Sequence, residues 1–146
     1  MYKHILLATD LAEDSGFLFN KAQKMCACTK AKLTLIHVVE PFYPYSDMYF
    51  GVEDLEKQQM KEAQKKLAVL ADKLKVSAED QVLKLGQTKS TILEVAEHLG
   101  VDLIMCGSHG RHGIRLLLGS IANAILHGAK CDVLTVRMAD LPKKLI

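Results

Sequence analysis

Residues 101–120 read Val-Asp-Leu-Ile-Met-Cys-Gly-Ser-His-Gly-Arg-His-Gly-Ile-Arg-Leu-Leu-Leu-Gly-Ser. The apolar run that ends at Cys106 predicts a strand covered on both faces. The glycines from Gly107 to Gly113 let the backbone approach a ligand and present N–H groups to phosphate oxygens. Gly119-Ser120 then opens a predicted helix, whose positive end attracts anions. This order of strand, loop and helix predicts a parallel sheet with a phosphate or nucleotide cradle at one edge.

Cationic and titratable side chains accompany these glycines. His109, Arg111, His112 and Arg115 supply hydrogen-bond donors close to the predicted cradle. The segment is not a Walker A loop, because no Gly-Lys-Ser/Thr ends it, and it is not a GxGxxG fingerprint. The alternative interpretation is a loop whose glycines only form turns.

The rest of the chain continues the alternation of strands and helices. Besides the strand over 101–106, short β-rich runs predict strands over 3–9, 32–39, 81–85 and 132–136, and apolar residues at helical spacing predict four helices between them. Thr91 with Glu94 resembles a capping box that opens the third helix, and Gly100 is placed as its left-handed C-cap. The pattern predicts one α/β domain over residues 1–146, an open, mostly parallel five-stranded sheet with helices on both faces.

In sheets of this kind, ligands bind at the carboxyl ends of the strands, where the strand order reverses. Thr9-Asp10 ends the first predicted strand, and its carboxylate either accepts a hydrogen bond from a ribose or base, or caps the following turn. The segment 42–50 after the second strand holds five of the eight aromatic residues. Those rings either cover a ligand site or contact a partner, or pack over the long helix.

Composition limits the function classes. Nineteen Lys and Arg against seventeen Asp and Glu leave a net charge of +2, and the basic residues are scattered along the chain. This distribution argues against a dedicated nucleic-acid binder. The first apolar run of the chain is short and ends at the charged Asp10, which is not the pattern of a signal peptide. No run approaches the ~20 apolar residues of a membrane span. We therefore expect a cytoplasmic protein. The four cysteines are expected to be reduced core residues, with Cys106 and Cys131 in buried strands and Cys26 and Cys28 on a helix. No metal site or catalytic motif is expected.

Several of these motifs together resemble the universal stress protein family. They are Tyr2–Asp10, Leu35–Val38, Asp102–Gly110, Gly119-Ser120 and Val133–Val136, and they follow the family's order across nearly the whole chain. The resemblance implies an adenine-nucleotide-binding-like fold with strand order 3-2-1-4-5, a protective regulatory role in stress, and homodimers that pair their last strands. Val133, Leu134, Thr135 and Val136 would then form the dimer interface.

Some members of the family bind ATP, whereas others, which resemble universal stress protein A, lack the glycines and do not bind it. The first hypothesis is that this chain binds ATP or a related adenine nucleotide, with Mg²⁺. The residues that carry over to the nucleotide-binding set are Ala8, Thr9, Asp10, Val38, Met105, Gly107, Gly110, Arg111, Gly119, Ser120 and Ile121. ATP-binding members have Gly-x-x-Gly, nine residues and then Gly-Ser/Thr, whereas the segment here from Arg111 to Leu118 has eight residues. Because of this departure, a nucleotide-free homodimer that acts through protein contacts stays open as an alternative. A third alternative is an enzyme with slow ATP hydrolysis or self-phosphorylation, with Ser108, His109 or Ser120 as the acceptor.

Overall fold

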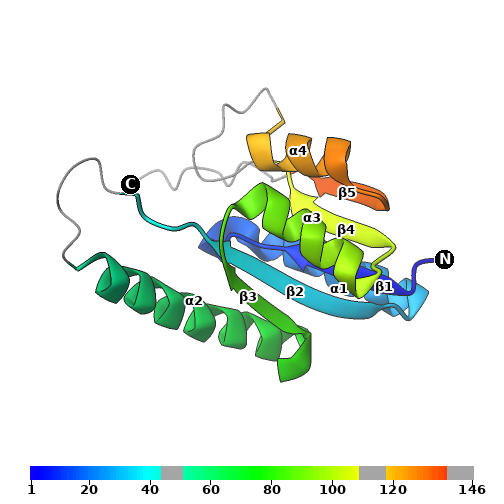
Figure 1. The fold of residues 1–146 in the computed structure, drawn as a ribbon. Coiled ribbons are helices and arrows are strands. Elements are labelled where there is room, and N and C mark those ends of the chain that lie inside the picture. The colour runs from blue at the N-terminus through cyan, green and yellow to red at the C-terminus, as the bar shows by residue number, and fades with distance from the viewer. Residues whose placement is uncertain (44–50, 109–117, 138–146) are drawn as a thin grey trace, which may run out of the picture.

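The computed structural model describes residues 1–43, 51–108 and 118–137 (Figure 1). Within these residues the chain forms a five-stranded parallel sheet of order β3-β2-β1-β4-β5, which confirms the predicted fold and strand order. The strands are β1 (His4–Ala8), β2 (Lys32–Val39), β3 (Gln81–Leu85), β4 (Leu103–Gly107) and β5 (Asp132–Val136). The helices are α1 (Gly16–Thr29), α2 (Val52–Leu74), α3 (Thr88–Leu99) and α4 (Ser120–Gly128), with short 3-10 helices η1 (Glu13–Ser15) and η2 (Ala78–Asp80).

The core has two layers because side chains alternate along each strand. One cluster joins Leu7, Leu35 and Met105 of the sheet to Leu18 of α1 and Leu67 of α2. The other joins sheet residues of opposite parity, among them Leu6, Ile36 and Ile104, to apolar residues of α3 and α4. Helices α1 and α2 therefore cover one face of the sheet and α3 and α4 the other (Figure 1).

The amino ends of β1 and β4 are joined by the side chain of Asp102. Its carboxylate accepts hydrogen bonds from the N–H groups of Lys3 (2.8 Å) and His4 (3.0 Å), and its own N–H donates to the carbonyl of His4 (3.0 Å). Burial raises the pKa of Asp102, but the backbone hydrogen bonds outweigh it, so the pKa lies below its usual value. This pair of central strands is thus aligned by a charged group.

The predicted capping box of α3 is wrong. The helix begins at Thr88, one turn before Thr91, and Gln87 at its N-cap makes no side-chain cap bond. Instead, the carboxylate of Glu40, just after β2, accepts from the backbone N–H (3.3 Å) and hydroxyl (2.8 Å) of Thr88. A cap from another element replaces the local one, because β2 and β3 are neighbours and end at the same edge. Gly100 is confirmed as the left-handed C-cap, at φ 61°.

The cysteines also differ in part from expectation. All four are free thiols and Cys106 is buried in β4, as predicted. Cys131, however, lies one residue before β5 and is half-buried, and Cys28 is exposed on α1. Cys28 is two residues from the half-buried Cys26, and residues at that spacing occupy different faces of a helix. The expectation of four core cysteines was therefore wrong for Cys28.

Candidate functional site

The strand order reverses between β1 and β4. From β1 the chain moves to β2 and β3 on one side, and from β4 it moves to β5 on the other. Loops that leave neighbouring strands in opposite directions open a crevice at the carboxyl edge, which is where ligands bind in open α/β sheets. The candidate site therefore lies where β1 and β4 end.

The backbone at the end of β1 is held from β2. The N–H of Thr9 donates to the carbonyl of Ile36 (3.0 Å), and Nδ1 of His37 lies 2.7 Å from the carbonyl oxygen of Thr9. Because a carbonyl oxygen only accepts, Nδ1 of His37 carries the proton in this bond. The hydroxyl of Thr9 in turn accepts from the N–H of Leu11 (3.0 Å), whose φ of 59° turns the chain out of the strand. The first loop of the site is thus fixed by hydrogen bonds to β2 and to the Thr9 hydroxyl.

The carboxylate of Asp10 takes part in this turn. Its Oδ1 atom accepts from the N–H of Ala12 (3.0 Å) and from the hydroxyl of Ser15 (3.2 Å). Of the two roles left open by the sequence, this geometry is that of the turn-capping residue. Asp10 is nevertheless exposed, and its second oxygen, Oδ2, makes no hydrogen bond to the described residues. One carboxylate oxygen thus remains available at the edge.

The end of β4 and the start of α4 are tied together. Ser108 N–H donates to the carbonyl of Val136 (2.9 Å), and Gly119 N–H donates to the carbonyl of Ser108 (2.8 Å). The N-cap residue Gly119 offers no side chain, so it makes no side-chain cap bond to the first turn of α4. Ser120 and Ile121 of that turn are exposed. The amino end of α4, which carries the positive end of the helix dipole, thus lies beside the end of β4.

The structure brings together most, not all, of the predicted nucleotide-binding residues. Ala8 and Val38 lie near the ends of β1 and β2 and belong to the same buried cluster as Ala122 of α4. Met105 is fully buried in the opposite cluster, on the α1 and α2 face. Strand alternation therefore separates it from Ala8 and Val38. Gly110 and Arg111 lie outside the described residues, as do His109 and most of the aromatic segment 42–50.

The four residues predicted for the dimer interface lie on β5, an edge strand. Val133, Leu134 and Thr135 are half-buried in the single chain, whereas Val136 is already buried at 5% exposure. Leu134 packs on the α1 and α2 side and Val133 on the other. The outer side of β5 faces no strand within the described part of the chain.

Metal binding and membrane crossing can both be checked on the described residues. Across ranges 1–43, 51–108 and 118–137, no three His, Cys, Asp or Glu side chains gather as a metal would require. Among the helices of the same ranges, none has the length and apolar character needed to cross a membrane.

Two residues that organise this edge carried no clear signal in the sequence. His37 holds Thr9, and Glu40 caps α3, the helix next along the carboxyl edge. The available signal was a polar residue within, or directly after, an apolar strand. Such residues indicate a tertiary hydrogen bond but do not identify its partner.

A five-stranded parallel sheet whose strand order reverses between β1 and β4, with helices on both faces, defines an open α/β protein. The chain belongs to the universal stress protein family, whose family model matches residues 1–137. This finding confirms the resemblance seen in the motifs.

Individual relatives agree with this assignment. Universal stress protein A homolog 2 of Coxiella burnetii is 49% identical over 141 residues, covering 94% of this chain and 96% of the relative. Among solved structures, the hypothetical protein MJ0577 superposes with a TM-score of 0.83 at 24% identity, covering 97% of this chain and 99% of that one. A universal stress protein in complex with cAMP superposes with a TM-score of 0.69 at 23% identity, covering 94% and 99%.

Proposed function

We propose that this protein is a cytoplasmic stress-response regulator that binds ATP or a related adenine nucleotide in the crevice between β1 and β4. The observation that carries the proposal is that Thr9 and Ser108 directly follow β1 and β4, neighbouring parallel strands, and that Gly119 is hydrogen-bonded to the carbonyl of Ser108. The three residues therefore lie at one edge of the sheet. A protein of the same fold and family has been solved with cAMP, an adenine nucleotide. We infer a regulatory role and not catalysis, in keeping with the family to which the chain belongs.

The crevice suits a phosphorylated ligand for an electrostatic reason. The N-cap Gly119 makes no side-chain bond to the first turn of α4, which leaves the N–H groups and the helix dipole of that turn to phosphate oxygens in this proposal. In this proposal Gly119, Ser120 and Ile121 lie along the phosphates, and Ala8 and Val38 lie towards the base. Mg²⁺ would arrive with the triphosphate, since the described residues contain no metal cluster of their own.

The variant Ser120→Glu tests the proposal. A carboxylate at the start of α4 favours the helix dipole, so the fold is retained, but it repels phosphates. We expect saturable binding of a fluorescent ATP analogue, measured by anisotropy and displaced by ATP or cAMP, with affinity reduced at least tenfold in Ser120→Glu.

The matched control is Gln58→Glu, which adds the same single charge on an exposed position of α2. It should bind the analogue as the wild type does. The proposal fails if no saturable binding occurs up to millimolar nucleotide, or if Ser120→Glu and Gln58→Glu bind equally well.

One observation favours the second candidate, a nucleotide-free homodimer that acts through protein contacts. Oδ1 of Asp10 is used in the turn to Ala12 and Ser15, so that oxygen is not free for a ribose. This candidate predicts a dimer through β5 that assembles without nucleotide. Sedimentation velocity tests it: Thr135→Lys places like charges on the paired edges and should yield monomers, whereas Lys57→Thr on α2 should leave the dimer intact.

A further inference from the structure

The α1 and α2 face of the sheet carries a groove that the nucleotide crevice does not use. Residues from Leu11 to Gln23 form one wall, and residues from Lys65 to Leu74 of α2 form the other. Its volume is about 910 Å³. Neighbouring helices on one sheet face usually pack 8–10 Å apart, yet here their facing side chains leave an open channel.

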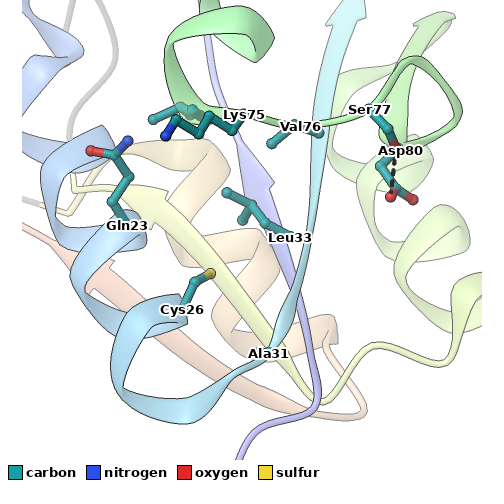
Figure 2. A pocket seen from close by; sticks show the side chains of 9 residues that line it. Gln23, Cys26, Ala31, Leu33, Lys75, Val76, Ser77 and Asp80 are labelled. Carbon is teal, nitrogen blue, oxygen red and sulfur yellow. Dashed lines mark hydrogen bonds between the residues drawn. The ribbon is translucent and has the colours of Figure 1, made fainter.

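The groove continues to the amino edge of the sheet. A second hollow of about 430 Å³ shares Gln23 and Leu74 with the first. Figure 2 shows this second hollow, with Cys26, Leu33 and Lys75 among the side chains that line it. The two hollows together follow α1 over most of its length. A helical segment of about 12 residues spans roughly 18 Å, which matches the wall from Ala12 to Gln23.

The floor of the groove is apolar. Phe19, Leu11 and Leu74 are only partly buried and pack on the core beneath the groove. Val69, which lines the α2 wall, is 58% exposed. A valine with this exposure inside a concave surface gains by burial, at about 25 cal/mol per Å² of apolar surface covered.

The rim is positively charged. Lys65, Lys66 and Lys73 line the larger hollow, where Glu13 is the acidic lining residue, and Lys75 lines the smaller one. Asp80, which also lines the smaller hollow, is already paired with Lys32 at 2.7 Å. With respect to the described residues, the four rim lysines form no ion pair. Their charge is therefore not neutralised within this part of the chain.

We propose that this groove binds an acidic amphipathic segment of a partner protein. The apolar side chains of the segment lie against Phe19 and Val69, and its carboxylates pair with Lys65, Lys66 and Lys73. Aliphatic groups form most of the floor and Phe19 is its one aromatic ring among the lining residues, so the surface lacks the series of rings on which single-stranded nucleic acids stack.

The test uses a defined probe, a fluorescein-labelled helical peptide of about 15 residues that carries leucine on one face and glutamate on the other. We expect saturable anisotropy with this peptide and no saturation with its lysine-for-glutamate counterpart. The triple variant Lys65→Glu, Lys66→Glu, Lys73→Glu should bind at least about tenfold more weakly. Val69→Ser, which changes no charge, should also weaken binding, because it reduces the apolar floor.

The control reverses three other exposed lysines, Lys57, Lys61 and Lys89, and so has the same net charge as the rim variant. It should bind the acidic peptide within about twofold of the wild type. The proposal is overturned if the control loses as much affinity as the rim variant, or if both peptides bind equally. It is also overturned if the acidic peptide fails to saturate up to about 1 mM.

Other occupants give distinct results. Tighter binding of anionic phosphatidylglycerol vesicles or of a DNA duplex, lost in the rim variant, would assign the groove to those partners and overturn the proposal. Dissociation of a dimer in the rim variant, without peptide, would assign it to a second copy. Circular dichroism and thermal melting establish that each variant is folded. Because the rim variant leaves α4 unchanged, its ATP-analogue binding separates this proposal from the nucleotide site.

Discussion

Nδ1 of His37 lies 2.7 Å from the carbonyl oxygen of Thr9, so that a side chain of β2 holds the backbone where β1 ends. The two residues are 28 positions apart in the chain. Thr9 is buried, and a buried carbonyl that loses its hydrogen-bond partner costs free energy. This contact therefore couples the stability of the sheet to the shape of the candidate site.

Replacing His37 should lower stability through this bond. His37→Ala is expected to reduce the free energy of unfolding by about 1–2 kcal/mol. His37→Asn should recover part of the loss, because its amide nitrogen is the same number of bonds from Cα as Nδ1. Urea denaturation provides the measurement, with exposed His98→Ala as the control. Equal losses in the Ala and Asn variants would contradict the role given to Nδ1.

The Asp102 carboxylate should give a pH-dependent contribution to stability. Its folded-state pKa is lowered, so its stabilisation is complete above the unfolded-state pKa of about 3.9 and is lost as the pH falls through the folded-state value. Asp102→Asn should cost about 1–2 kcal/mol at pH 7, and the difference from wild type should shrink below about pH 4. Urea denaturation at several pH values measures this, with Asp72→Asn on α2 as control. A difference that does not vary with pH would refute the charge-assisted bonds.

The cap of α3 by Glu40 predicts an unequal pair of substitutions. Glu40→Ala should destabilise by about 1 kcal/mol, as loss of an N-terminal cap does, whereas exposed Glu94→Ala should change stability by less than about 0.5 kcal/mol. Thermal unfolding followed by circular dichroism measures both. A larger loss of stability in Glu94→Ala than in Glu40→Ala would instead support the capping box that the sequence predicted.

Gly100 and Gly16 should respond differently to alanine. Gly100 has φ 61°, where an L side chain is strained, so Gly100→Ala should cost about 1 kcal/mol. Gly16 opens α1 with φ −54°, and an added Cβ there meets no heavy atom within 4 Å. Gly16→Ala should therefore be neutral or stabilising by up to about 1 kcal/mol. Denaturant midpoints compare the two variants, and a loss in Gly16→Ala would show an unseen steric conflict.

Alkylation should rank the cysteines by their environment. Burial raises the pKa of Cys106 to about 11, so little thiolate forms at pH 8 and the sulfur is shielded. Cys28 is exposed and should react first with iodoacetamide. Peptide mass spectrometry over time gives the order, and the same reaction in urea should remove the difference. Labelling of Cys106 as fast as Cys28 in the folded protein would contradict its burial.

The sequence by itself determined the elements and their alternation. Predicted strands over 32–39, 81–85 and 132–136 have the observed bounds, because short apolar runs and helical periodicity are local patterns that burial on a parallel sheet requires. The end of a buried strand followed by glycines also identified the edge at which the candidate site lies. The strand order came from the family resemblance and not from the periodicity.

Only the tertiary structure decided which residues meet at that edge. Glu40 caps Thr88 from 48 residues away, and His37 holds Thr9 from the neighbouring strand. Strand alternation placed Met105 on the face opposite Ala8 and Val38, although the resemblance grouped the three. The lysine-rimmed groove likewise depends on how α1 and α2 lie on the sheet. Such contacts depend on strand order and helix spacing, which bring distant residues together, and local sequence patterns do not encode the partner of a polar side chain.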